Sequence, residues 1–192
     1  VSCMQKLGRR YPHCGYGGRF YHWIFSNDPQ PYYSFGNGAA MRVSAVGFAA
    51  RNIDEVKTLS RAVTAISHDH PEGLKGAESV AMAIFLARQS KTKQQIRDYI
   101  EQNYYKIGFT LDEIRGTYEF NETCQNTVPQ AFEAFFEAKD FEDAIRNAVS
   151  VGGDSDTLAA ITGSIAEAYF GVPFNLRKKA ESYIDNDTFR PI

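Results

Sequence analysis

Apolar residues recur at helical spacing through the second half of the chain, and this pattern constrains the fold more than any other feature. One set of positions follows the i, i+3, i+4, i+7, i+8 spacing of an amphipathic helix: Phe141, Ala144, Ile145, Ala148 and Val149. Asp140 is a suitable N-cap for this helix, and the pair Gly152-Gly153 is a suitable end. We therefore predict an amphipathic helix between Asp140 and Gly152.

Two further helices are predicted, one on either side of this one. Pro129 suits the first turn of the preceding helix, whose apolar positions are Phe132, Phe135 and Phe136. The third helix follows Asp154 and ends at Gly171. Its apolar positions are Leu158, Ile161, Ile165, Ala168 and Tyr169.

The first half of the chain shows the same period. Residues 53–67 form one predicted helix, 77–89 an alanine-rich buried helix and 92–105 another, while the aromatic stretch 16–25 is expected to be a partly buried helix. The residues of the first of these expected to face inward are Val56, Leu59, Val63 and Ile66. The two-residue alternation of strands is absent over any useful length. The sequence predicts an all-α fold, a compact helical bundle with its functional residues in loops at helix ends.

The length and net charge of the chain limit the classes of protein to which it can belong. With 192 residues the chain can build one domain with its own core, and we expect residues 1–192 to form a single domain. The formal net charge of −2 argues against binding nucleic acid through an extended basic surface. No apolar run reaches the roughly 18 residues of a membrane helix, so no membrane partner is expected.

Cysteine usage and the first residues bear on location and completeness. The cysteines Cys3, Cys14 and Cys124 are odd in number and include no CxxC pair. We therefore expect a reducing, cytoplasmic location and no disulfide framework. The chain starts at Val1, and its opening residues resemble the tail of a helix already under way. We expect residues to be missing before Val1.

Three loops carry residues suited to ligand chemistry, and the first is residues 152–157, GGDSDT. Asp154, Asp156 and Thr157 stand at a helix entrance, where side chains at i, i+2 and i+3 can converge on one point. Two carboxylates and a hydroxyl are hard oxygen ligands of the kind that Mg²⁺ prefers, although an octahedral ion needs about six. The alternative is that Asp154 only caps the helix while Asp156 interacts with its dipole.

The second loop, residues 34–42, has the sequence SFGNGAAMR. Two glycines flank Asn37 before an apolar helix, and backbone N–H groups at such a start suit a phosphate or pyrophosphate. Ser34 and Asn37 could add side-chain hydrogen bonds, and Phe35 could stack on a base. The alternative is a tight turn with close helix packing.

The third loop, residues 67–73, has the sequence SHDHPEG. His68, Asp69, His70 and Glu72 fall close together beside Pro71. A zinc site, an ordinary polar loop and a ligand-facing loop are the alternatives here, and neither histidine has a cysteine partner at ligand spacing.

Taken together and in order, these loops and their helices resemble a known family. The segments SFGNGAAMRVSAVG, SHDHPEGLKGAESVAMAIFLAR and DFEDAIRNAVSVGGDSDTLAAITGSIAEAYFGVP are similar to the ADP-ribosylglycohydrolase family, relatives of the enzyme that removes ADP-ribose from dinitrogenase reductase. The resemblance extends from about Tyr16 to Tyr183. It implies an all-α, orthogonally packed fold and a Mg²⁺-dependent hydrolase that removes ADP-ribose from a protein side chain or another acceptor.

The resemblance also implies roles for the three loops. Family members usually hold two Mg²⁺ ions, and Asp154, Asp156 and Thr157 would form one side of that site. The residues that would contact ADP-ribose are Ser34, Phe35, Gly36, Asn37, Gly38, His68 and His70. The implied reaction is hydrolysis of the bond to ribose C1″ through an oxocarbenium-like state.

One departure from the family pattern leaves a second interpretation open. Family members carry an N-terminal Thr-Asp-Asp-Thr/Ser motif that supplies the opposite half of the metal site, whereas this sequence contains no Asp-Asp pair. For the same reason no catalytic acid or base is assigned. The alternative is an inactive ADP-ribose-binding module, or a structural remnant that self-associates through the surface left by the missing segment.

Overall fold

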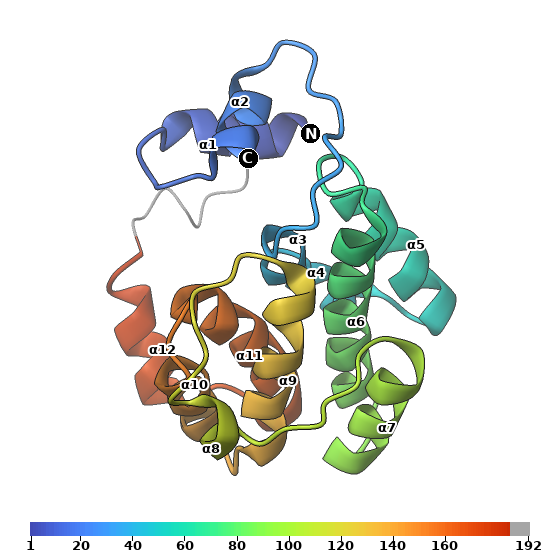
Figure 1. Cartoon of the computed structure of the whole chain (residues 1–192), viewed down its shortest axis with the longest axis vertical. Coiled ribbons are helices and arrows are strands. Elements are labelled where there is room, and N and C mark those ends of the chain that lie inside the picture. The colour runs from blue at the N-terminus through green and yellow to red at the C-terminus, as the bar shows by residue number, and fades with distance from the viewer. Residues whose placement is uncertain (185–192) are drawn as a thin grey trace.

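Helix α6 (Pro71–Arg88) is the central element of the computed structural model, which describes residues 1–184. It is buried almost throughout from Gly73 to Ala87, and it packs against α3, α4, α5, α7 and α11. Figure 1 shows these neighbours on several sides of it. A helix that is apolar on every face is stable only when other elements surround it. The buried, alanine-rich helix predicted from the sequence is confirmed.

The other described elements are also helical. Their bounds are α1 (Ser2–Arg10), α2 (Gly18–Phe25), α3 (Gly38–Met41), α4 (Ser44–Ala49), α5 (Ile53–Thr64), α7 (Lys93–Asn103), α8 (Leu111–Ile114), the 3-10 helix η1 (Cys124–Asn126), α9 (Val128–Glu137), α10 (Phe141–Ser150), α11 (Ser155–Phe170) and α12 (Phe174–Glu181). Residues 1–184 contain no strand, and one isolated antiparallel bridge joins Gly36 to Thr123. The all-α prediction is confirmed. None of the helices in this part of the chain has the length and apolar character that crossing a membrane requires.

The three helices predicted in the second half of the chain build much of the core. The largest fully buried side chains in them are Phe132, Phe135, Leu158, Ile161 and Ile165. α10 packs against both α9 and α11, and its buried face consists of Ala144 and Ala148, whose small side chains allow close approach. The prediction places Val149 on this face, but its side chain is 52% exposed because it belongs to the last turn of the helix.

Helix α5 exists as predicted and Val56 is buried as predicted, but the prediction that Leu59 and Val63 face inward is wrong. Leu59 and Val63 are 37% and 40% exposed, whereas Val56, Ser60 and Thr64 are buried. This i, i+4, i+8 stripe packs against α6. The small polar residues on it let the two helices lie close together, and the Ser60 hydroxyl donates to a carbonyl of its own helix.

Helices α1 and α2 form a small layer that Figure 1 shows apart from the rest of the molecule. The two helices touch at Gly8, where an added Cβ would lie 2.8 Å from a side-chain atom of α2. Gln5 and Arg9 donate to carbonyl groups at the C-terminal end of α2, which its own helix leaves without partners. The Trp23 indole N–H donates to the Ile66 carbonyl at 3.0 Å. This bond anchors the layer to the turn before α6.

Replacing Asp140 by alanine is expected to lower the free energy of unfolding by about 1 kcal/mol. The Asp140 side chain caps α10 by accepting a hydrogen bond from the Asp143 N–H at 2.8 Å, and alanine leaves that N–H to water. Urea unfolding followed by circular dichroism measures the change. Asp140→Asn keeps an acceptor and should stay close to the native midpoint. Equal losses in the two variants would contradict the capping role.

Candidate ligand-binding and metal site

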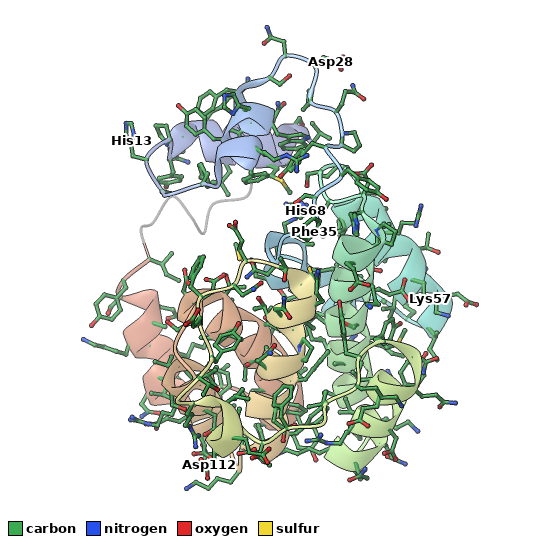
Figure 2. The ribbon with its side chains drawn as sticks, viewed as in Figure 1. His13, Asp28, Phe35, Lys57, His68 and Asp112 are labelled. Carbon is green, nitrogen blue, oxygen red and sulfur yellow. The ribbon has the colours of Figure 1, made fainter. Side chains whose placement is uncertain are left out.

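The three loops meet around a cavity of about 620 Å³. Figure 2 shows Phe35 and His68 beside one another near the start of α6, facing the layer formed by α1 and α2. The predicted site residues that line this cavity are Ser34, Phe35, Gly36, Asn37, Gly38, His68, Asp154, Asp156 and Thr157. The fold therefore brings together, in one hollow, residues from segments far apart in the sequence.

Two glycines in the left-handed conformation shape the first loop, residues 152–157, called the aspartate loop below. Gly152 has φ +81° and Gly153 has φ +62°, values that a residue with a Cβ rarely adopts. At Gly153 the backbone also lies against the Tyr118 ring, since a Cβ there would stand 2.6 Å from a ring carbon. Helix α11 then begins, so Asp154 lies just before the helix and Asp156 in its first turn.

The carboxyl groups of Asp154 and Asp156 interact with one another. Burial raises the pKa of Asp154, a hydrogen bond from Asn37 opposes this, and the nearby Asp156 adds to it. Hydrogen bonding to Asp154 lowers the pKa of Asp156. The Asp154 side chain makes no capping bond to α11. Because two ionised carboxylates at one site repel each other, a cation bound between them would stabilise the fully ionised pair.

Asn37 joins the second loop, residues 34–42 and called the glycine loop below, to the aspartate loop. Its Nδ2 donates to Asp154 Oδ2 at 2.6 Å and to Thr127 Oγ1 at 3.1 Å. Its backbone N–H donates to the Glu122 carbonyl at 2.7 Å. The amide nitrogen is therefore occupied within the protein, which leaves the amide oxygen as the atom that could reach a ligand.

The glycine loop rests on Cys124. The Cys124 N–H donates to the Phe35 carbonyl at 3.0 Å, and its thiol donates to the Gly36 carbonyl at 3.2 Å. Burial raises the pKa of Cys124 to about 12, so the group remains a thiol that can donate. On its other side Sγ touches α6 at Gly76, where a Cβ would lie only 2.6 Å away. The glycine loop is thus held in place by Cys124, which is itself packed against helix α6 in the buried core.

His68 lies at the bottom of the glycine loop with only 5% of its surface exposed. A Cβ added at Gly36 or at Gly38 would stand 3.6 Å from His68 Nε2, so this nitrogen faces both glycines. Burial, and then the charge of Arg42, lower the pKa of His68 to about 3. The ring is therefore neutral at physiological pH. Burial also lowers the pKa of Arg42, whose guanidinium lies 5.7 Å from the centre of the Phe20 ring.

His70 lies outside the lining of the cavity. Its Nδ1 accepts a hydrogen bond from the Glu72 N–H at 3.0 Å, which caps α6. Its ring contacts the rings of Tyr33 and Phe35 at centroid distances of 4.6 and 5.1 Å. His70 can therefore support the Phe35 ring from outside the cavity.

Several lining residues were not singled out from the sequence. Arg42 was part of the second loop motif, where a basic residue directly after a glycine-rich turn could have marked it as an anion contact. Arg19, Phe120 and Glu122 also line the cavity. They come from segments without a recognisable motif, and only the tertiary fold brings them to the site.

Asp154, Asp156 and Thr157 fit one side of a magnesium site. They offer carboxylate and hydroxyl oxygens, which are suitable ligands, and Asp154 keeps one oxygen free of the Asn37 bond. Within residues 1–184 no three His, Cys, Asp or Glu side chains gather closely enough to hold an ion by themselves. An ion here would take its remaining ligands from water or from a bound phosphate.

The sequence is similar to proteins of known family. Residues 4–184 match the family model described as ADP-ribosylglycohydrolase. The chain is 28% identical over 203 residues to ADP-ribosylhydrolase ARH3 of Homo sapiens, an alignment that covers 80% of this chain and 56% of that protein. An uncharacterized protein of Archaeoglobus fulgidus is 27% identical over 153 residues, covering 71% and 50%. The chain thus spans about half the length of the curated relatives it matches.

A solved structure shares the fold. It is an ADP-ribosylglycohydrolase-related protein complex, which matches with a TM-score of 0.70 and 24% sequence identity. The superposition covers 93% of this chain and 70% of the other. At this sequence identity the structural similarity supports the all-α architecture alone.

Proposed function

Because the chain belongs to the ADP-ribosylglycohydrolase family, we propose that its cavity binds ADP-ribose and that the protein hydrolyses the bond between ADP-ribose and an acceptor. In this proposal the acceptor is a modified protein side chain or another group attached to ribose C1″. The observation that carries it is the 2.6 Å hydrogen bond from Asn37 Nδ2 to Asp154 Oδ2, which joins the glycine loop and the aspartate loop at one cavity.

The charges around the cavity favour a ligand that is both anionic and metal-bound. Arg19 and Arg42 lie near His68 and supply positive charge for a diphosphate. Asp154 and Asp156 line the same cavity and would repel that diphosphate. A divalent cation held by the carboxylates would turn this repulsion into attraction, which supports magnesium as the cofactor.

Different parts of the cavity would hold different parts of ADP-ribose. The Phe35 ring is exposed and offers a face on which a base can stack. Gly36 and Gly38 carry no side chain between the backbone and the ligand, so the diphosphate can approach the backbone there, and the Gly38 N–H is the donor it would meet. The Gly36 N–H already donates to Ser34 Oγ at 3.2 Å. Asp154, Asp156 and Thr157 would hold Mg²⁺ on this side, and bound Mg²⁺ orients hydroxyl groups and lowers the pKa of water.

Replacing Asp156 by asparagine is expected to remove the effect of Mg²⁺ on ADP-ribose binding. In the native chain we expect Mg²⁺ to strengthen binding by at least about tenfold, because the ion links the carboxylates to the diphosphate. In Asp156→Asn one charged ligand is lost, so affinities with and without Mg²⁺ should agree. Isothermal titration calorimetry of ADP-ribose, with Mg²⁺ and with EDTA, makes the comparison.

Asp54→Asn is the matched control, because Asp54 occupies the second position of α5 as Asp156 does in α11. It removes the same interaction with a helix dipole away from the cavity and should leave the effect of Mg²⁺ intact. If native binding does not respond to Mg²⁺, the metal part of the proposal is wrong. If ADP-ribose does not bind at all, the proposed ligand is wrong.

Hydrolysis is tested separately from binding. Release of ADP-ribose from peptides modified on serine or on arginine, followed by chromatography, shows which linkage is cleaved. Turnover that depends on Asp156 supports the hydrolase. Tight, metal-dependent binding without any release would favour the alternative of an ADP-ribose-binding module. The observation that motivates this alternative is that the sequence contains no Asp-Asp pair.

A further inference from the structure

Two polar side chains contact the ring nitrogen of His68 that faces away from the glycine loop. Arg42 Nη2 donates to Ser67 Oγ at 2.6 Å, and Ser67 Oγ lies 2.8 Å from His68 Nδ1. Arg42 Nη2 also approaches His68 Nδ1 directly, at 3.4 Å. Ser67 is fully buried and His68 nearly so. Bulk water therefore does not compete for these groups.

The chemistry of these partners determines where the imidazole proton lies. A guanidinium can only donate hydrogen bonds, so Ser67 Oγ accepts from Arg42. Among the contacts that the described residues make with the buried Ser67 hydroxyl, His68 Nδ1 is the remaining acceptor, so the hydroxyl hydrogen is directed to it. The direct contact with Arg42 presents a second donor to the same nitrogen. His68 Nδ1 is thus an acceptor, and in a neutral ring the proton then lies on Nε2.

The protonated nitrogen faces the place proposed for the ligand. His68 Nε2 lies toward Gly36 and Gly38, and both glycines line the cavity together with His68 and Arg42. The hydrogen bonds that the His68 ring makes within residues 1–184 involve Nδ1, and none of them gives Nε2 an acceptor. An N–H group in this position needs an acceptor from water or from a ligand.

We propose that Arg42 and Ser67 are positioning residues that hold His68 as the neutral Nε2–H tautomer, so that this N–H donates to an oxygen of the bound ligand. The tautomer follows from the contacts of the chain itself. Its use toward ADP-ribose rests on the proposed function. The charged groups near the ring are Arg42, Arg19 and Asp69, and Asp69 is already engaged by the Tyr33 N–H at 2.7 Å.

The tautomer can be measured without any ligand. Long-range ¹H–¹⁵N correlation spectra distinguish Nδ1–H, Nε2–H and doubly protonated rings, and His68→Gln identifies the His68 signals among the four histidines. We expect native His68 to show the Nε2–H pattern at pH 7. In Ser67→Ala the hydroxyl is lost, and we expect a mixture of the two neutral forms. Ser67→Thr keeps the hydroxyl and should restore the native pattern.

Ligand binding tests the use of the donor. We expect Ser67→Ala to weaken ADP-ribose binding by about three- to tenfold, and Ser67→Thr to recover part of this loss. Ser60→Ala is the matched control, because Ser60 is also buried but donates within its own helix. It should leave both the His68 spectrum and the affinity unchanged.

A native His68 ring that is protonated on Nδ1, or charged at pH 7, overturns the inference. So does a Ser67→Ala chain that folds, by circular dichroism, with the native His68 pattern and native affinity. If ADP-ribose fails to bind the native chain while His68 shows the Nε2–H pattern, the proposed function fails and the positioning by Arg42 and Ser67 stands.

Discussion

Phe132→Ala is expected to lower the free energy of unfolding by about 3–5 kcal/mol. Phe132 is completely buried in α9, its ring stacks near that of Phe136 at a centroid distance of 6.2 Å, and α9 packs against both α10 and α11. Alanine removes the apolar surface and leaves a cavity that rigid helices cannot fill. Because total stability is about 5–15 kcal/mol, the loss is large enough to show clearly in urea unfolding.

Phe174→Ala is the control for this substitution. Phe174 lies in α12 with 74% of its surface exposed, so its removal should change stability by no more than about 0.5 kcal/mol. Phe132→Leu keeps much of the volume and should fall between the two. Similar unfolding midpoints for Phe132→Ala and Phe174→Ala would mean that α9 does not pack as described.

Gly153→Ala is expected to destabilise the chain by about 2–5 kcal/mol and to abolish metal-dependent ligand binding. The left-handed backbone costs a residue with a Cβ about 1–2 kcal/mol, and the overlap with the Tyr118 ring adds about 1–3 kcal/mol. The residue that follows is Asp154, so any shift that relieves the overlap moves a proposed metal ligand. Urea unfolding and calorimetric titration of ADP-ribose with Mg²⁺ measure the two effects.

A substitution at the neighbouring Gly152 distinguishes the cost of the left-handed backbone from the cost of the overlap with the Tyr118 ring. Gly152 has φ +81°, but a Cβ there would meet nothing within 4 Å. Gly152→Ala should therefore cost only the backbone contribution, about 1–2 kcal/mol, and should keep most of the ligand affinity. Equal effects at both positions would show that the contact between Gly153 and Tyr118 is unimportant.

Helix positions could be predicted from the sequence wherever large apolar residues leave only one face to bury. In α9 and α11 phenylalanine, leucine and isoleucine at helical spacing determine that face, as the burial of Phe132 and Ile161 confirms. In α5 the apolar pattern was misleading, because close packing on α6 selects the stripe of Ser60 and Thr64 in place of Leu59. The hydrophobicity of a sequence alone does not indicate how closely two helices approach each other.

The candidate site, like the fold, could be predicted from the sequence only in part. Short motifs placed Asn37, His68 and Asp154 at loops, and the fold brings those loops together. Arg19 and Glu122 belong to the same cavity through long-range packing, which no local pattern encodes. For His70 a local signal was present, since Pro71 in the first turn makes the residue before it the N-cap of α6.

The hydrogen bond between Asn37 and Asp154 spans 117 positions of the chain. Bringing together residues so far apart closes a long loop, and this closure costs conformational entropy. A partly folded chain can contain α6 or the α9–α11 core and still lack the cavity. We therefore expect ligand-binding capacity to report the fraction of fully folded molecules more strictly than helix content does.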